Sequence, residues 1–384
     1  MKEIRIVFFL DHFGGGGVQE YLYQISRYLD KSKFNITIVA LHVGSGQFLP
    51  RFQELGIKII VLSSTRHYIG LEFYYNFIKL IKTYKFDVVH SFLPGGFLFA
   101  LMFSTLTRTP LIHSIHSVPQ QGPKWYFPMM GLMQGRVYAY VGFDEKALRN
   151  AGISPAKIKI TELLLDFDNA LSIDKSGKDG SSEQPILLSI GRLHVDKGHE
   201  FAIRVMPYIL QKWPSAKLIV VGDGNDRNRL ENIVKELDIS LQVEFTGYQS
   251  NLIPYLSKAD IMLRTSVNEG MNITIILGMA AGLPIVGFDA GIPKDFIVDQ
   301  KTGLLVPLKD IQSLAKAVIL LLESRSLQYT LAQRARQALV KYFDRQKFLS
   351  YQEYLYKCVA TRLPSLEISD LKDAIWPQFN PFAE

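Results

Sequence analysis

Short apolar runs alternate with longer amphipathic segments through the first half of the chain. The runs are rich in β-branched or aromatic residues and short enough to be buried parallel strands, and they span residues 4–10, 35–41, 57–62, 87–90 and 111–115. Between the first two, Leu22, Ile25 and Leu29 recur at helical spacing, and residues 71–84 form another helix-like stretch. This alternation predicts an α/β fold built on a doubly wound parallel sheet.

A polar segment divides this pattern in two. Residues 174–184 read DKSGKDGSSEQ and contain no large apolar side chain, which is typical of a linker. The strand pattern then restarts at residues 186–190, 217–221, 243–245, 261–263 and 285–287. We therefore expect two doubly wound Rossmann-like domains facing a central cleft, the first over residues 1–173 and the second over residues 185–340. Because open parallel sheets bind ligands outside the carboxyl ends of their strands, the loops after the strands are the places to look for a site.

The composition is that of a globular protein and narrows the choice of partners. The 384 residues are 48% hydrophobic and 21% charged, and the chain is long enough for two domains. A formal net charge of +7 favours anionic partners such as phosphorylated metabolites or membrane surfaces. No nucleic-acid-binding module is recognised, so nucleic acid is not an expected partner. The single cysteine, Cys358, excludes an intramolecular disulfide and argues against a cysteine-based metal site.

The apolar segments do not predict a leader or a membrane span. The first ten residues are interrupted by Arg5 and fit a strand better than a signal peptide. The longest apolar stretch, residues 92–106, contains Pro94, Gly95 and Gly96 and is too short to span a bilayer. We expect a cytoplasmic protein with at most peripheral contact at the inner face of the membrane.

Four glycines, residues 14–17, follow the first predicted strand and precede the first predicted helix. Glycines at such a junction let the main chain approach a ligand closely and leave the first helical N–H groups available to an anion. The spacing differs from the GxGxxG pattern of dinucleotide-binding loops. A flexible strand-to-helix turn is the alternative interpretation, although four successive glycines exceed what a turn needs.

A pair of cations follows the first strand of the second half. Gly191 and Arg192 end this strand, and Lys197 and Gly198 come shortly before the next helix pattern. Two cations at the carboxyl end of a strand can neutralise a diphosphate leaving group, whereas in isolation such a pair is more often solvated surface.

The segment 266–281, SVNEGMNITIILGMAA, combines a carboxylate with a predicted helix start. Glu269 can accept hydrogen bonds from sugar hydroxyls, and the N–H groups of Gly270, Met271 and Asn272 can bind phosphate. A Glu that merely stabilises the first turn of a helix is the alternative.

These motifs occur together in one order along the chain. The ordered set comprises the glycine loop 14–17, Gly191-Arg192 with Lys197-Gly198, 221–224 (VGDG, with Gly222), 245–247 (FTG), 259–260 (AD), Ser266 with Glu269-Gly270, 279–284 (MAAGLP) and 302–307 (TGLLVP). As a set it resembles the retaining glycosyltransferases of family 4, which have the GT-B fold. The resemblance covers nearly the whole chain and is most specific over residues 191–307.

The resemblance implies a nucleotide-diphosphate sugar bound mainly by the second domain and a glycan, lipid-linked or protein acceptor bound mainly by the first. Arg192 and Lys197 would bind the diphosphate, and Glu269 would hold donor-sugar hydroxyls. Residues 341–384, with Trp376, Phe379 and Phe382, would cross back to the first domain or cover a partner surface. The remaining implied donor contacts are Gly16, Gly17, Gly191, Gly222, the amides of Gly270, Met271 and Asn272, and His116 near the donor sugar. No metal or cofactor is implied, because cations of the protein face the diphosphate.

Two other histidines, His90 and His113, fit structural roles better than catalytic ones, and a structural role is also the alternative for His116.

The chain departs from the family pattern at the second of two glutamates that have seven residues between them. This position, where the family generally holds the ribose of the nucleotide, is Leu277. Loss of a charged acceptor there costs about 1.5–3 kcal/mol of binding free energy, or one to two decades in affinity. Further departures are Gly142, residues 162–164 before the retained apolar Leu165 and Asp166, and Lys294. They leave open an alternative in which the chain is a catalytically degenerate partner or chaperone of an active glycosyltransferase.

One more segment interleaves a cation with large apolar side chains. Lys124, Trp125, Tyr126 and Phe127 are followed by further Met and Leu residues up to residue 133. We interpret the segment either as an interfacial patch that reaches a lipid-linked acceptor or as a helix packed into the core.

Overall fold

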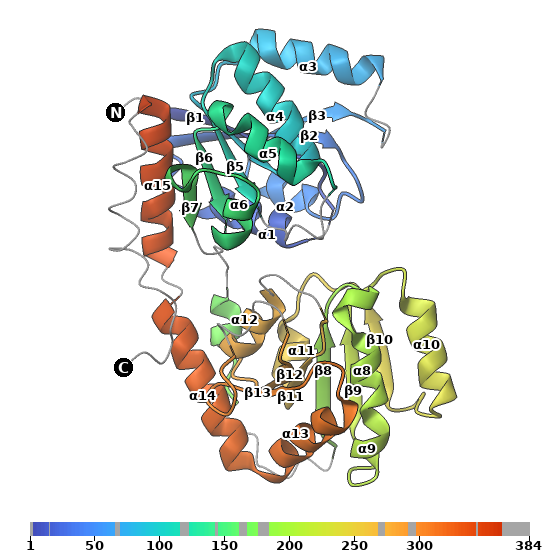
Figure 1. The fold of residues 1–384 in the computed structure, drawn as a ribbon. Coiled ribbons are helices and arrows are strands. Elements are labelled where there is room, and N and C mark those ends of the chain that lie inside the picture. Colours follow the sequence, from blue (N-terminus) through green and yellow to red (C-terminus); the bar gives the residue numbers. More distant parts are fainter. Residues whose placement is uncertain are drawn as a thin grey trace. The chain divides into compact units, whose positions relative to one another are not determined.

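The computed structural model describes residues 3–14, 16–65, 70–115, 123–142, 145–160, 167–175, 184–267, 273–290, 297–342 and 345–362. The chain divides into two compact units. Unit 1 comprises Met1–Leu165 and Asp344–Gln378, and unit 2 comprises Asp166–Phe343 and Phe379–Glu384. Each is an α/β unit with its own hydrophobic core (Figure 1).

Unit 1 is built on a parallel sheet whose strand order, over the described residues, is β3-β2-β1-β4-β5-β6-β7. Its strands are β1 (Ile4–Leu10), β2 (Phe34–His42), β3 (Lys58–Ser63), β4 (Val88–Phe92), β5 (Leu111–Ile115), β6 (Ala139–Gly142) and β7 (Ile158–Ile160). In register, Ile6 of β1 pairs with Ile36 on one side and with Val88 on the other. The chain thus leaves β1 in one direction and returns to its other side at β4, which creates a switch point between the carboxyl ends of these two strands.

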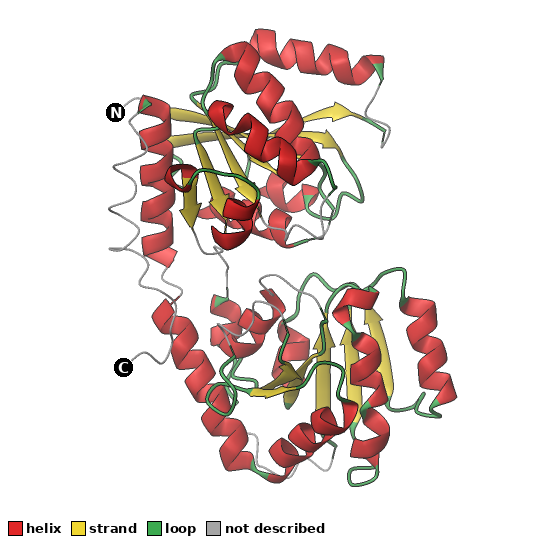
Figure 2. Cartoon of the chain, in the orientation of Figure 1, coloured by secondary structure: helices red, strands yellow, loops and turns green. Residues whose placement is uncertain are grey.

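Helices cover both faces of this sheet (Figure 2). They are α1 (Gly17–Tyr28), α2 (Leu49–Glu54), α3 (Leu71–Thr83), α4 (Pro94–Thr107), α5 (Tyr126–Met133), α6 (Glu145–Asn150) and α15 (Arg345–Thr361), with short 3-10 turns η2 (Gln134–Arg136) and η3 (Pro155–Lys157). Successive residues of a strand face opposite sides of the sheet. Accordingly Phe9 packs against Phe103 of α4, whereas Phe8 packs against Tyr356 of α15.

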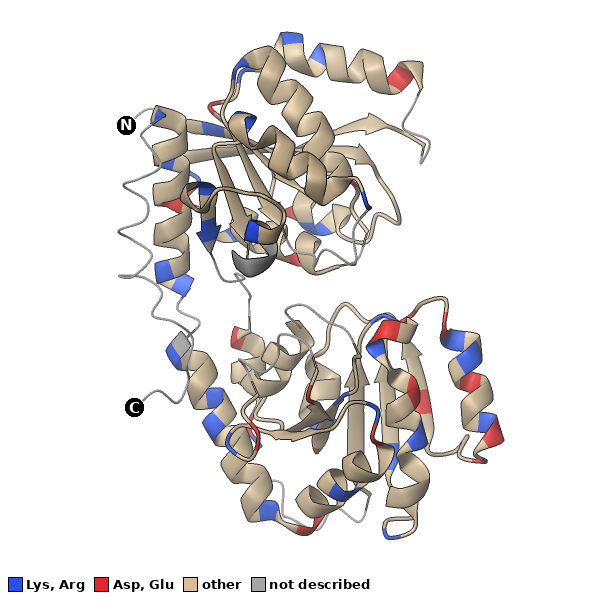
Figure 3. Cartoon of the chain, in the orientation of Figure 1, with Lys and Arg blue, Asp and Glu red and all other residues tan. Residues whose placement is uncertain are grey.

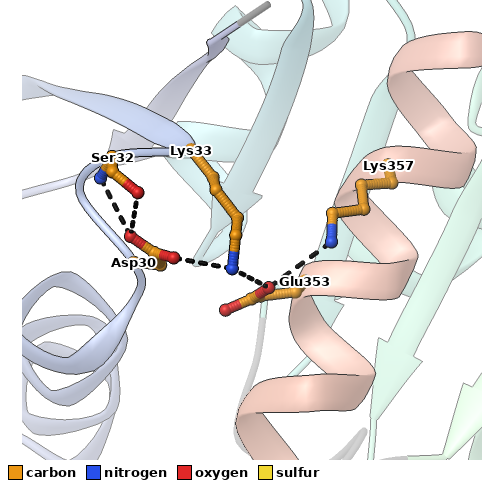
Figure 4. A network of polar contacts seen from close by, with 5 residues as sticks. All are labelled: Asp30, Ser32, Lys33, Glu353 and Lys357. Atoms are coloured by element: carbon orange, nitrogen blue, oxygen red, sulfur yellow. Dashed lines mark hydrogen bonds and ion pairs between the residues drawn. The ribbon is translucent and has the colours of Figure 1, made fainter. Parts of the chain in front are cut away.

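The C-terminal helix α15 belongs to unit 1, although it follows unit 2 in sequence. The Tyr356 hydroxyl lies 2.9 Å from Nδ1 of His90, whose Nε2 lies 2.7 Å from Oγ of Ser114. At the rim, Glu353 pairs with Lys33 at 3.6 Å and with Lys357 at 3.5 Å (Figure 4). We expected residues 341–384 to return to the first domain; α15 does so, and residues 363–384 lie outside the described residues.

Unit 2 is a second parallel sheet with the order β10-β9-β8-β11-β12-β13 over its described residues. Its strands are β8 (Ile186–Ile190), β9 (Lys217–Val221), β10 (Val243–Gly247), β11 (Ile261–Arg264), β12 (Ile285–Phe288) and β13 (Leu304–Val306). Its helices are α7 (Asp168–Leu171), α8 (His199–Arg204), α9 (Met206–Leu210), α10 (Arg227–Glu236), α11 (Ile253–Lys258), α12 (Ile273–Ala280), α13 (Ile311–Glu323) and α14 (Arg325–Tyr342), with the 3-10 turn η4 (Val195–Lys197). Here the switch point lies between β8 and β11.

The first residues of the predicted linker are attached to unit 2. The Lys175 ammonium donates to the carbonyl oxygens of Leu256, Ser257 and Ala259, each at 2.7 Å. These carbonyls form the C-terminal end of α11, where a cation is stabilised by the helix dipole. Residues 176–183 lie outside the described residues.

None of the helices within the described residues is both long enough and apolar enough to cross a bilayer.

Candidate functional site

The loop that follows β8 is held along the end of the neighbouring strand β9. The Gly191 N–H donates to Val221 O at 3.0 Å, and the Leu193 N–H donates to Asp223 O at 3.0 Å. Leu193 is fully buried, whereas the side chain of Arg192 between them is exposed. Two main-chain anchors therefore fix the position of Arg192 at the carboxyl edge of the sheet and leave its guanidinium open to a ligand.

At Gly222 the loop after β9 approaches the main chain of the loop after β8 closely. The φ of Gly222 is +143°, and a Cβ at this position would lie 1.9 Å from the Gly191 carbonyl oxygen. Gly224 has φ +159° and a comparable approach, with a Cβ position 2.3 Å from Leu193 O. Only glycine fits such contacts. The structure thus places Gly222 against Gly191, and its direct contact with a donor stays a prediction.

The turn η4 carries Lys197 to the β8–β11 switch point. Gly198, with φ +61°, leaves no room for a side chain because a Cβ would lie 2.0 Å from Thr265 O. The Val267 N–H donates to Asp196 O at 2.9 Å, which joins the loop after β8 to the loop after β11. The half-buried Lys197 has its Cγ 3.7 Å from the Cβ position of Gly191, so its aliphatic part passes beside this glycine.

Glu269, Gly270, Met271 and Asn272 lie outside the described residues. In sequence, Glu269 comes two residues after Val267, whose main chain is bonded beside Lys197. The chain thus enters the Glu269 segment directly from the switch point.

Leu277 lies on the less buried side of α12. It is half-buried, as is Ile273 one turn before it, whereas Ile276 and Met279 are buried in the core. Gly278 allows α12 to approach β11 closely, since a Cβ there would lie 2.5 Å from Met262 Sδ. The side chain of Leu277 can contact an apolar group but cannot accept a hydrogen bond.

Two supporting residues at this edge were not predicted from the sequence. His199 is buried, and its Nδ1 lies 2.9 Å from Oγ of Ser189 on β8. Arg264 is also buried at the end of β11, and its Nη1 donates to Phe288 O on β12 at 2.7 Å. The available signal for Arg264 was a cation that ends an otherwise apolar strand, IMLR.

In unit 1, Gly16 and Gly17 begin α1. Gly16 supplies no side-chain cap, and its φ of 166° is extended backbone that any residue can adopt. The side chain of Gln19 turns back and donates to His12 O at 3.2 Å. The described part of the glycine loop therefore presents the start of a helix without a capping side chain, as an anion-binding loop requires.

Asp11 fills the switch point of unit 1 and is a further residue that sequence reasoning missed. Its carboxylate accepts hydrogen bonds from the N–H groups of Gly95, at 3.2 Å, and Gly96 at the start of α4. Burial raises the pKa of Asp11 to about 6, against the opposing effect of these two N–H groups. Gly96 is required for this contact, because a Cβ there would lie 2.9 Å from Phe9 O.

Two histidines of unit 1 have the surroundings of structural residues, as the sequence suggested. His90 and His113 are fully buried and hydrogen-bonded, His113 through Ser91 and Tyr126, as structural roles require. His116 lies outside the described residues. The structure therefore brings together Gly191, Arg192, Lys197 and Gly222 in unit 2, whereas Gly16 and Gly17 belong to unit 1.

Comparison with known proteins covers both units. The family model "Glycosyltransferase Family 4" matches residues 15–162, and the model "Glycosyl transferases group 1" matches residues 173–338. Among curated proteins, the chain is 27% identical over 190 residues to the lipopolysaccharide core biosynthesis glycosyltransferase LpsE of Rhizobium meliloti. The aligned residues make up 50% of this chain and 55% of LpsE. It is 30% identical over 176 residues to N-acetyl-alpha-D-glucosaminyl L-malate synthase of Bacillus anthracis, and the aligned residues make up 46% of each chain. The chain thus spans about half the length of these two curated relatives.

Among solved structures, HepE of Anabaena in complex with UDP and glucose superimposes with a TM-score of 0.79 at 17% sequence identity, over 92% of this chain and 100% of HepE. This likeness shows the GT-B fold. These relatives are named as enzymes, and they give no support to the alternative of a non-catalytic partner subunit.

Proposed function

Because the chain belongs to the GT-B glycosyltransferases, with one family model matching each of its two units, we propose that it transfers a sugar from a nucleotide-diphosphate sugar to an acceptor with retention of anomeric configuration. The acceptor would be a glycan, a lipid-linked sugar or a protein. HepE binds UDP and glucose, so uridine diphosphate sugars are the first donors to test.

The observation that carries the proposal is the pair of cations at the switch point of unit 2. Arg192 is held by main-chain bonds on both sides, and Lys197 reaches the same edge through η4. A diphosphate placed here would meet two positive charges as its own negative charge develops during departure. Glu269, which follows Val267 closely, would accept hydrogen bonds from the sugar hydroxyls.

The same arrangement implies that the transfer needs no metal ion, since the protein supplies the charge that a metal would otherwise provide. Turnover that survives a chelator would agree with this, and turnover that requires an added divalent cation would contradict it.

Because of Leu277, the donor site would bind the ribose of the nucleotide less strongly than it binds the phosphates. An apolar side chain there cannot bind the ribose hydroxyls, so we propose a lower affinity for the nucleotide than a glutamate would give, by one to two decades.

Isothermal titration with UDP-, GDP- and ADP-sugars tests the proposal. We expect one nucleotide class to bind, and Arg192→Ala or Lys197→Ala to weaken its binding by roughly ten- to a hundredfold. Matched controls are Arg334→Ala and Lys235→Ala, which remove exposed cations from α14 and α10 and should leave the affinity unchanged. Absence of binding to every nucleotide sugar and free nucleotide diphosphate would overturn the proposal. For an active donor, the anomeric configuration of the product, read by NMR, tests retention.

A further inference from the structure

Helices α3 and α4 of unit 1 expose large apolar side chains in two stripes. On α3 they are Leu71, Tyr75 and Ile78, exposed by 91%, 67% and 51%; on α4 they are Leu98, Met102 and Leu106, exposed by 37%, 41% and 65%. We call these six residues the apolar face. Within each helix they recur at intervals of three or four residues, so each set occupies one side of its helix.

The opposite sides of both helices already form the core of the unit. Phe73, Phe77 and Leu80 of α3 are buried, as are Phe97 and Phe103 of α4. The two helices are neighbours, since the rings of Phe73 and Phe99 lie 4.7 Å apart and meet edge to face. Helix α4 is apolar on its exposed side as well, and a helix that is apolar all round requires a second apolar environment beyond the core it packs on. The apolar face is therefore not explained by the folding of unit 1.

Charge around the apolar face is unevenly distributed. The fourteen residues of α4 include no charged side chain. Lys79 and Lys82 on α3, Lys85 just after it and Lys124 just before α5 are exposed lysines. Figure 3 shows the basic positions of α3 at the opposite end of the helix from its acidic position. The one acidic residue of α3, Glu72, accepts hydrogen bonds from the N–H and hydroxyl of Ser64.

We propose that the apolar face docks on the surface of an anionic phospholipid bilayer. Leu, Ile and Met side chains would enter the boundary between headgroups and acyl chains, while the lysines meet lipid phosphates. Trp125, exposed by 47% beside Lys124, supplies the aromatic ring typical of that boundary. Of the patch expected from the sequence at 124–133, Trp125 and Leu132 are exposed, Leu132 by 77%, whereas Tyr126, Phe127 and Met130 are buried.

A second copy of the chain fits this surface less well. In a two-fold interface the same surface of both copies is in contact. The lysines near the apolar face would then face the same lysines of the second copy, without compensating acidic residues. Lipid phosphates supply the missing negative charge, and a fluid bilayer accommodates a convex helical surface without a matching groove. Charge complementarity thus favours the membrane.

Flotation of the full-length chain with vesicles tests the proposal without donor or acceptor, so its outcome is independent of the proposed transferase activity. We expect binding to vesicles containing phosphatidylglycerol, weaker binding at raised salt, and little binding to pure phosphatidylcholine. The double variant Lys79→Glu/Lys82→Glu should lower the partition coefficient roughly thirtyfold or more. The triple variant Leu98→Gln/Met102→Gln/Leu106→Gln should lower it by about tenfold or more.

Matched controls separate these effects from general changes in charge and surface hydrophobicity. Lys235→Glu/Lys316→Glu changes the net charge equally on unit 2, and Leu241→Gln/Leu320→Gln/Val340→Gln removes exposed apolar side chains there. Both should bind vesicles as the unaltered chain does. A thermal melt of every variant checks that it is folded.

Three results would overturn the proposal. The first is an unaltered chain that does not float with anionic vesicles. The second is that the lysine double variant and the triple variant on α4 both float as well as their matched controls. The third is a dimer, seen by light scattering, that the triple variant on α4 converts to a monomer, since a second copy would then cover this face.

Discussion

At residue 222 the main chain of a neighbouring loop occupies the space that a side chain would need. Gly222→Ala would place a Cβ 1.9 Å from Gly191 O at a φ of +143°, so the two loops must separate. We expect a loss of at least about 3 kcal/mol in the free energy of unfolding, measured in urea. Gly282→Ala is the matched control, because φ is +68° but the nearest atoms lie 3.8 Å away, and it should cost about 1–2 kcal/mol. Equal losses for the two variants would show that the close approach imposes no constraint.

Asp11 gives the protein a measurable pH dependence. Burial raises its pKa from 3.8 to about 6, so between these values the native state holds a proton that the unfolded state releases. The contribution of Asp11 to the free energy of unfolding is therefore greatest below pH 4 and falls by up to about 3 kcal/mol as the pH rises through 6.

The Asp11→Asn variant isolates this effect from the other carboxylates. An amide does not titrate, so the stability of the unaltered chain minus that of Asp11→Asn should fall as the pH rises from 4 to above 6. Urea denaturation across this range measures the difference. A difference that stays constant with pH would mean that the pKa of Asp11 is the same in the native and unfolded states, as for an ordinary exposed carboxyl.

At the scale of elements, two kinds of contact hold α15 on unit 1, and they differ in strength. The Tyr356 hydroxyl is hydrogen-bonded to Nδ1 of the fully buried His90. The Lys33–Glu353 ion pair lies at the solvent-exposed rim (Figure 4). We expect Tyr356→Phe to lower the free energy of unfolding by about 1–2 kcal/mol, because a buried hydrogen bond is lost. Lys33→Ala should leave it unchanged within error, because water and salt screen an exposed ion pair. The reverse order, measured by urea denaturation, would contradict this assignment.

Four of the apolar runs predicted from the sequence match an observed strand at both ends. The expected runs 4–10, 111–115, 186–190 and 217–221 coincide with β1, β5, β8 and β9. Strands β6, β7 and β13, of four, three and three residues, were not predicted. Their positions are decided by pairing with neighbouring strands.

The candidate site was predictable to the extent that it depends on sequence-local positions. Arg192 and Lys197 follow a recognisable strand, so the rule for parallel sheets was enough to single them out. Asp11 was not, because its partners Gly95 and Gly96 come from a loop more than eighty residues away and only the fold brings them together. The packing of Gly222 on Gly191 is likewise a long-range contact, which no local sequence pattern predicts.

At the scale of the whole molecule, the two units differ in continuity. The described part of unit 2 comes from one uninterrupted stretch of chain, whereas unit 1 needs α15, which follows unit 2 in sequence. On α15, Phe348, Leu355, Tyr356 and Val359 are buried, and Tyr356 packs against Phe8. Burial of these side chains contributes on the order of 10 kcal/mol, which is comparable to the entire stability of a domain.

This difference predicts the behaviour of fragments. Residues 166–343 should fold alone with one sharp urea transition, because their core is complete without residues from unit 1. Residues 1–165 should lack a cooperative transition and bind a hydrophobic dye, because removing α15 uncovers Phe8 and the buried His90. Joining residues 345–362 to that fragment through a flexible linker should restore the transition, whereas the same peptide with Tyr356→Asp should not. A cooperative transition for residues 1–165 alone would show instead that α15 is only an accessory to a unit that is stable without it.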